Sequence, residues 1–235
     1  MMNKKIKKQV FIIFAILITL LVFLLGVWQV SRHFEKKEII INYHNQLAKL
    51  PVEINDLTIL DKDKDKYLII KIEARNISEN FIYLGPRTVN KELGYNLVAL
   101  FENRAKQPLL INLGFIKLAQ KDNIKLDQNF QQFTLMKREL QERPSIFIPR
   151  NEPSAKQWFY LEEEALNENF NVNFNGIYFD LLSENFAAEI MPFKRDRITF
   201  FNEHFNYALT WFALTFALIC MMIYYLRQEN VFSKK

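Results

Sequence analysis

The sequence is poor in the residues that build many catalytic and metal sites. It contains a single cysteine, Cys220, which lies within a long apolar run. One cysteine excludes an intrachain disulfide, and it excludes metal sites built from several thiolates. The chain has only five glycines, and neither a glycine-rich phosphate loop, a nucleophile elbow nor a zinc spacing appears in it. We therefore expect a protein that is not an enzyme.

Positive charge is scarce in the middle of the chain. The formal net charge is +5, of which residues 1–31 contribute +4 and residues 207–235 contribute +2, so residues 32–206 carry −1. A nucleic-acid-binding domain needs its positive charge on the folded surface. We therefore predict no nucleic-acid partner. Cations at the two ends of the chain are instead those that decide membrane topology.

What the chain does contain is two long apolar runs. Val10–Trp28 spans nineteen residues, and Tyr207–Leu226 spans twenty residues without a charge. As helices, both are long enough to cross roughly 30 Å of hydrocarbon. A cleaved signal peptide is the alternative for the first run, but its length and the bulky, polar residues that follow favour an uncleaved anchor. Lysines before the first run predict that both termini are cytoplasmic.

The fold class that follows is a membrane protein of α+β type. Between the spans, short runs rich in β-branched and aromatic residues predict strands at 67–73, 80–84, 95–101, 108–116, 130–140, 171–182 and 186–190, with a helix at 158–166. We predict a basic cytoplasmic N-terminus (1–9), a transmembrane helix (10–30), a helical stalk (31–50), an extracytoplasmic antiparallel β-rich domain with a few helices (51–200), a second transmembrane helix (201–226) and a cytoplasmic C-terminus (227–235).

The segment Asp61–Lys66 invites a calcium interpretation. Its carboxylates alternate as in the first half of an EF-hand loop. It lacks the required glycine and a bidentate glutamate at the twelfth position, and its interleaved lysines oppose a bound cation. We predict a solvated turn.

Four blocks of residues carry a resemblance to a known family, in that family's order. They are Leu25–Arg32 (LGVWQVSR); Gly85-Pro86-Arg87 with Gly94-Tyr95 and Leu110–Ile116; Pro149–Pro153 with Trp158-Phe159-Tyr160; and Asn202-x-His204-x-x-Tyr207-Ala208-Leu209-Thr210-Trp211-Phe212. Together with two spans that enclose one domain, these blocks make the chain similar to the surfeit locus family of cytochrome c oxidase assembly proteins. The chain departs from the family pattern at Leu113, where Arg is usual, at Lys117, where Pro is usual, and at Leu100, which a Pro often precedes.

The resemblance implies a factor that matures the catalytic subunit of a haem-copper oxidase by binding and delivering haem a. Haem iron takes an imidazole as axial ligand, and the family's suspected ligand corresponds to His204. If Asn202 caps the second helix, His204 lies in its first turn. Residues expected to surround the porphyrin are Trp28, Gln29, Arg32, Arg87, Tyr207 and Trp211, with the two arginines as candidate partners of the propionates. Expected partners are the oxidase catalytic subunit, haem a synthase and the lipid bilayer.

Each of these residues also has a purely structural interpretation. His204, Tyr207 and Trp211 fit an aromatic belt at the membrane surface. Trp28 and Gln29 fit a belt residue and an interhelical hydrogen bond, and Arg87 fits a turn with a surface ion pair. His33 lies at the same level as His204 and is a possible second axial ligand, although no family motif includes it.

The competing function is therefore a membrane scaffold without a cofactor, which stabilises an oxidase assembly intermediate through protein–protein contacts. An enzyme acting in the membrane has no visible nucleophile–base pair or metal constellation to support it. The sequence has no Arg- and Ser-rich transit segment before the first span, which favours a bacterial inner membrane over a mitochondrial one.

Overall fold

The computed structural model describes residues 4–64, 66–121, 124–140, 142–182, 186–187, 189–192 and 202–232. The chain divides into two compact units, one made of Met1–Ile41 with Phe200–Lys235 and the other of Asn42–Thr199. Helix α1 (Lys4–Ala48) contributes to both units, and α3 (His204–Phe232) belongs to the first. The predicted stalk is thus the continuation of the first helix, which ends three residues before Pro51.

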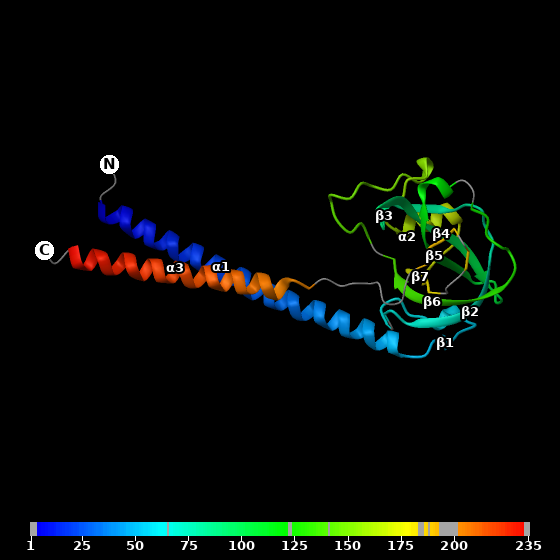
Figure 1. The fold of residues 1–235 in the computed structure, drawn as a ribbon, viewed down its shortest axis with the longest axis horizontal. Helices are drawn as coiled ribbons and strands as arrows, with labels where there is room; N and C mark the ends of the chain where they lie inside the picture. Colours follow the sequence, from blue (N-terminus) through cyan, green and yellow to red (C-terminus); the bar gives the residue numbers. More distant parts are fainter. Residues whose placement is uncertain are drawn as a thin grey trace. The chain divides into compact units, whose positions relative to one another are not determined.

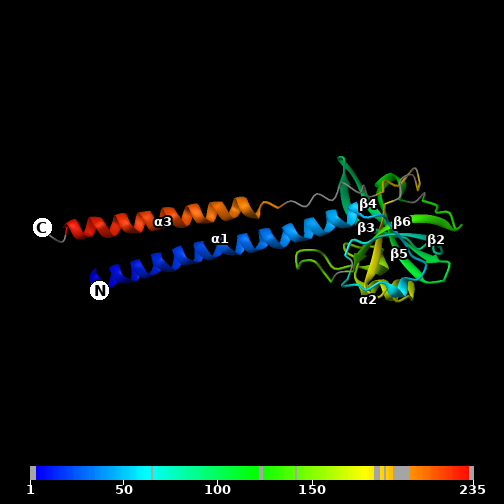
Figure 2. The same ribbon diagram turned by 90° about the horizontal axis from the view of Figure 1, so that it is seen from below.

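In the first unit α1 and α3 lie side by side (Figure 1 and Figure 2). The side chains that are shielded on both helices recur at alternating spacings of three and four residues, which is the heptad pattern of two helices packed along a seam. The set with this spacing is Ile12, Ala15, Thr19, Val22, Gly26, Gln29 and His33 on α1, and His204, Ala208, Trp211, Thr215, Leu218 and Met222 on α3; neighbouring residues such as Ile18, Leu25, Val30 and Phe212 are also partly shielded.

Gly26 is the point of closest approach along this seam. A Cβ atom built on Gly26 would lie 2.7 Å from Cε1 of Phe212, so the phenyl ring rests on the bare backbone of α1. Phe23 packs on the same ring, with 5.8 Å between ring centroids. Small residues at such positions let membrane helices approach each other closely.

Both helices are long and apolar enough to cross a membrane by length and composition. Their most apolar windows have mean hydropathies of 3.3 and 1.9, and only 6% of each window is buried. The core helix of a soluble protein would be mostly buried. The apolar faces of α1 and α3 are instead exposed, as expected for helices that lipid surrounds.

The second unit is built on a seven-stranded sheet of described residues, which closes on itself. The ring arises because the long strand β4 pairs with β5 along most of its length and with β2 at its end. In order around the ring the strands are β2 (Ile69–Asn76), β6 (Gln131–Glu139), β7 (Ile177–Leu181), β5 (Pro108–Lys117) and β4 (Glu92–Asn103), with β1 (Val52–Glu53) beside β2 and β3 (Ile82–Val89) beside β4.

The prediction of an antiparallel domain is wrong in two places. Strand β5 pairs with β7 in parallel, and β1 pairs with β2 in parallel, while the remaining pairings are antiparallel. The sheet is therefore mixed. A parallel pair needs a long connection, and here the connection from β5 to β7 includes the whole of β6 and α2 (Glu163–Phe170).

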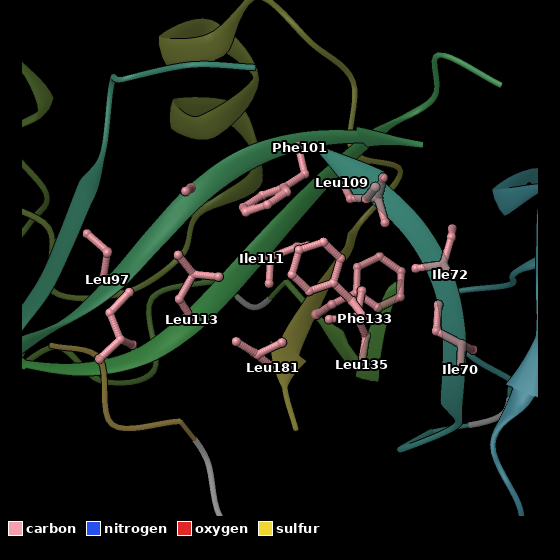
Figure 3. Close-up of a cluster of buried hydrophobic side chains, with 14 of the residues drawn as sticks. Ile70, Ile72, Leu97, Phe101, Leu109, Ile111, Leu113, Phe133, Leu135 and Leu181 are labelled. Atoms are coloured by element: carbon pink, nitrogen blue, oxygen red, sulfur yellow. The ribbon is translucent and has the colours of Figure 1, made fainter. Parts of the chain in front are cut away.

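The apolar core fills the interior of this ring. Figure 3 shows side chains from all five strands of the ring pointing toward one another, among them Leu97, Ile111, Phe133 and Leu181. A second cluster covers the outer surface of β4 and β5, where Val98, Leu100 and Leu110 pack with Trp158 and with Leu166 of α2. Strand β5 is therefore buried on both faces, which explains its continuous apolar sequence.

Several predicted elements need correction. Residues 158–162 are not helical, because Trp158 bridges Leu84 of β3, and α2 begins only at Glu163. The strand predicted over 171–182 is limited to Ile177–Leu181. Of the strand predicted over 186–190, the described residues form no strand, and residue 188 lies outside the described residues.

The reversal between β3 and β4 does not use the glycines of this region. Gly85 and Gly94 lie within β3 and β4, and the chain reverses at Asn90 and Lys91, both of which have positive φ. Arg87, for which a turn was one interpretation, lies within β3. A Cβ on Gly94 would lie 1.9 Å from the carbonyl oxygen of Ile116, so this glycine is required by the close approach of the neighbouring strand.

Candidate functional site

His204, the first residue of α3, forms the centre of the candidate site. Its Nδ1 lies 2.6 Å from Oε1 of Gln29 on α1, and its ring meets the edge of the Trp28 indole with 6.4 Å between centroids. A carbonyl oxygen only accepts hydrogen bonds. Nδ1 of His204 is therefore the donor, and Nε2 of the neutral ring keeps its lone pair for another partner.

The aromatic and cationic residues predicted around His204 are partly brought together. The guanidinium of Arg32 lies 5.9 Å from the centre of the Trp28 ring, and its Nη1 is 2.6 Å from Oε2 of Glu35. Both partners of this ion pair are 52% exposed, so the pair adds little stability. Trp28 and Tyr207 are exposed at the surface of the helix pair, whereas Trp211 is half-buried in its seam.

The chain before α3 is tied to α1 by a different contact from the one predicted. Asn202 does not cap α3, because its Oδ1 accepts no hydrogen bond from the described residues. Its Nδ2 instead donates to the backbone carbonyl of His33 over 3.0 Å. The carbonyl of Glu203 accepts the first helical hydrogen bond, from the amide of Tyr207. The prediction that His204 lies in the first turn of the helix is confirmed.

His33 lies one turn beyond Gln29 and packs on Phe205, with 5.6 Å between ring centroids. Its Nδ1 and the Oδ1 of Asn202 are both shielded and have no hydrogen-bond partner among the described residues. Two histidines thus lie at this level of the helix pair, and among the described residues Nδ1 has a hydrogen-bond partner in His204 but not in His33.

Arg87 belongs to the other unit, on strand β3, and is exposed. The amide of Gly85 donates to the carbonyl of Trp158 over 2.8 Å, so the Gly-Pro-Arg block and the Trp-Phe-Tyr block are neighbours. Asn151 completes this arrangement, because its Oδ1 accepts from the amide of Phe159 and its Nδ2 donates to the carbonyl of Tyr160. The four sequence blocks therefore form two clusters, one in each unit.

Sequence reasoning missed two buried charges in the second unit. Asp180 is buried against Arg138, with Nη1 and Oδ2 3.3 Å apart, and it accepts from Nδ2 of Asn112 over 2.9 Å. Burial outweighs both contacts and raises the pKa of Asp180 to about 6. Burial also raises the pKa of neighbouring Tyr178 to about 12. No sequence signal could have paired residues so far apart in the chain.

The second missed charge is Lys137, whose side chain is 1% exposed. Its ammonium group donates to the backbone carbonyls of Asp61, Lys62 and Lys64. The side chains of these three residues are exposed, as predicted for a solvated turn. The loop that resembled a calcium site does bind a cation through its carbonyls, and that cation is the protein's own lysine.

The comparisons with known proteins agree with this arrangement of blocks. The model of the SURF1 family matches residues 16–216, a segment that contains all four blocks and the His204–Gln29 contact. This chain belongs to the SURF1 family. The family is known generally for oxidase assembly factors and for membrane association.

Relatives cover nearly the whole chain at low identity. A SURF1-like protein of Dictyostelium discoideum is 24% identical, over 97% of this chain and 99% of its own length. A SURF1-like protein of Rickettsia conorii is 26% identical, over 93% of this chain and 90% of its own length. Surfeit locus protein 1 of Arabidopsis thaliana is 23% identical, over 88% of this chain and 75% of its own length.

Two of the departures from the family pattern have structural explanations. Leu113 is fully buried in the core inside the strand ring, where an arginine would need a partner. Lys117 lies at the surface end of β5 and forms an ion pair with Glu92 over 2.8 Å. Both positions lie in the second unit, outside the helix pair.

Proposed function

We propose that this SURF1 family member is a membrane-anchored assembly factor that holds haem a through His204 and delivers it to the catalytic subunit of cytochrome c oxidase. Both helices span the bacterial inner membrane in this proposal, with the two termini in the cytoplasm. The protein itself catalyses no reaction. The observation that carries the proposal is the hydrogen bond between Nδ1 of His204 and Gln29.

The hydrogen bond supports a ligand role for a physical reason. Histidines that bind metals almost always donate their second ring N–H to an oxygen, which fixes the tautomer and raises the basicity of the ligating nitrogen. His204 has this arrangement with Gln29, whereas His33 does not. Among the described residues no group of three His, Cys, Asp or Glu side chains gathers. A porphyrin would bring nitrogen ligands of its own, so that one histidine is enough to hold its iron.

The surroundings of His204 also fit a porphyrin. The exposed rings of Trp28, beside His204, and of Tyr207, in the first turn of α3, provide aromatic surfaces for a porphyrin. Ala208, one turn further along α3, is buried in the seam and offers no open surface. Arg32 supplies a cation that can pair with a propionate. This new pairing would replace an exposed ion pair of Arg32, which contributes little stability. When bound, the haem would supply the iron that the His204 imidazole ligates.

The test is a visible spectrum and pyridine haemochrome of the purified full chain, made in cells that synthesise haem a. We expect a haem a signal in the wild type that His204→Ala abolishes. Gln29→Leu keeps the ligand but removes its orienting partner, so haem affinity should fall by about 10- to 100-fold. His44→Ala, which removes an exposed histidine of the second unit, is the matched control and should bind haem as the wild type does.

The outcomes separate the two candidate functions. Haem that persists in His204→Ala moves the ligand elsewhere, and His33→Ala is then the next variant. Absence of haem from wild-type protein that is folded and membrane-inserted supports the cofactor-free scaffold, in which the His204–Gln29 bond only joins two helices. In that case His204→Ala should also leave oxidase assembly intact.

A further inference from the structure

The loop between β6 and α2 carries the most exposed pair of neighbouring apolar side chains in the described part of the second unit. Ile146 is 80% exposed and Phe147 is 90% exposed. They occupy the tip of a tight turn, in which the amide of Ile148 donates to the carbonyl of Ser145 over 3.1 Å. The amide of Phe147 also donates to Oγ of Ser145, over 3.3 Å.

The turn is held in this shape by an arginine. Nε of Arg143 donates to the carbonyl of Ile148 over 2.7 Å, and its Nη2 donates to the carbonyl of Ile146 over 2.9 Å and again to that of Ile148. Pro144 and Pro149 restrict the backbone on either side of the turn. An apolar pair that had no partner would be expected to fold back on the domain. Here the backbone contacts keep it pointing outward.

The shape of this tip favours a lipid surface over a protein surface. A stable protein interface buries about 800 Å² on each partner, far more than two side chains on a convex turn can present. The penetration of a few apolar side chains into the headgroup region is in contrast a common mode of membrane-surface binding. In addition, the chain enters this unit from an apolar helix and leaves it toward another, so a membrane is always nearby.

The charges around the tip are of the sign that a membrane surface attracts. Arg143 and the exposed Arg150 flank the turn, and no acidic residue lies between them in the sequence. Anionic headgroups attract such cations at the base of an inserted apolar pair. The nearest acidic residues in the sequence, Glu142 and the exposed Glu152, lie outside the pair of arginines on either side.

We propose that the turn formed by residues 145–148 inserts Ile146 and Phe147 into the headgroup region of the membrane that the chain spans, with Arg143 and Arg150 facing anionic lipids. This contact fixes the second unit against the bilayer at a point separate from its two covalent connections. This contact requires no cofactor, so the experiment that tests it gives its result whether or not the protein binds haem.

The experiment uses the full chain in lipid nanodiscs that hold one chain each. Cys220→Ser removes the only native thiol, and Phe147→Cys then accepts a polarity-sensitive fluorophore. Ile59→Cys, at a position that is 68% exposed in the same unit, is the matched control. The nanodiscs contain phosphatidylcholine and phosphatidylglycerol with brominated acyl chains as the quencher.

We expect blue-shifted emission at position 147, with roughly half of it lost to the brominated lipid, and little quenching at position 59. Adding Arg143→Ala should reduce the quenching at 147, because the turn loses its scaffold. Equal quenching at both positions, or none at 147, overturns the proposal. A blue shift at 147 without quenching also overturns it, because the tip would then be covered by protein.

Discussion

Asp180 gives the sharpest test of the packing in the second unit, because its burial makes a prediction about pH. The pKa of this carboxyl is raised from an ordinary value of 3.8 to about 6 by desolvation, which outweighs Arg138 and the amide of Asn112. A displacement of this size corresponds to about 3 kcal/mol of free energy between the two protonation states. The folded protein therefore disfavours the ionised form.

The direction of the pH dependence follows from this shift. Below pH 3.8 the carboxyl is protonated in both the folded and the unfolded states. Between pH 3.8 and about 6 the folded state holds the proton more tightly than the unfolded state, so the free energy of unfolding falls as the pH rises. The loss is complete about one pH unit above the folded pKa of about 6. It then amounts to about 3 kcal/mol relative to solution well below pH 3.8.

Other carboxyls act in the opposite sense. Hydrogen bonds lower the pKa of exposed Asp56, chiefly from Gln107, and that of exposed Asp61, chiefly from the amide of Asp63. Their contribution to stability is lost as the pH falls. The free energy of unfolding of the whole protein therefore contains contributions that rise with pH and contributions that fall with pH. The effect of Asp180 is isolated by comparing the wild type with Asp180→Asn, which retains an oxygen that can accept from Asn112.

The assay is urea unfolding of the full chain in detergent from pH 4 to pH 7, followed by the fluorescence of buried Trp158. Trp28 and Trp211 are replaced by Phe, so that Trp158 is the only indole. We expect the wild type to lose about 2 kcal/mol more than Asp180→Asn over this range, because at pH 4 the unfolded carboxyl is already partly ionised. Parallel profiles would refute the burial argument, and a wild type that instead gains stability relative to the variant would mean that the ion pair with Arg138 dominates.

Three further changes test other contacts. Lys137→Met should leave the carbonyls of residues 61, 62 and 64 without the ammonium group that they bind, and it should cost about 1–3 kcal/mol of stability. Faster hydrogen exchange limited to this loop and its neighbours would reveal the loss, and unchanged exchange would contradict the contact. Gly26→Val should drive a methyl group into Phe212 and destabilise the helix pair by about 1–3 kcal/mol. The measurement is the midpoint of SDS unfolding in mixed micelles, which should fall. Adding Phe212→Ala to this variant should restore part of the lost stability. Asn151→Ala should destabilise the second unit by about 1–3 kcal/mol in the urea assay, whereas a neutral result would mean that water replaces its hydrogen bonds.

The candidate site could be predicted from the sequence only in part. The position of His204 at the start of an apolar helix follows from local pattern, and so does the presence of Trp28 and Gln29 at the end of the other apolar run. Their contact does not, since it joins side chains separated by 175 positions. The assignment of Arg87 to the same site remains a prediction, since that residue belongs to the other unit.

Local physical chemistry determined the elements that depend on a single stretch of chain. The two apolar helices follow from length and composition, and most strands follow from β-branched and aromatic runs. The predicted stalk over 31–50 corresponds to the continuation of α1, which ends at Ala48. The order of the four sequence blocks was equally sufficient to identify the family. In each case the deciding information lies within a few neighbouring turns or strands.

Only the tertiary structure decided how these elements combine. The ring closes because β4 pairs with both β5 and β2, and β5 lies parallel to β7, pairings between segments far apart in the chain. The partners of Lys137 and Asp180 are also distant, being loop carbonyls for one and Arg138 with Asn112 for the other. Sequence patterns record which residues avoid water, whereas the partner of a buried strand or charge depends on the packing of the whole domain.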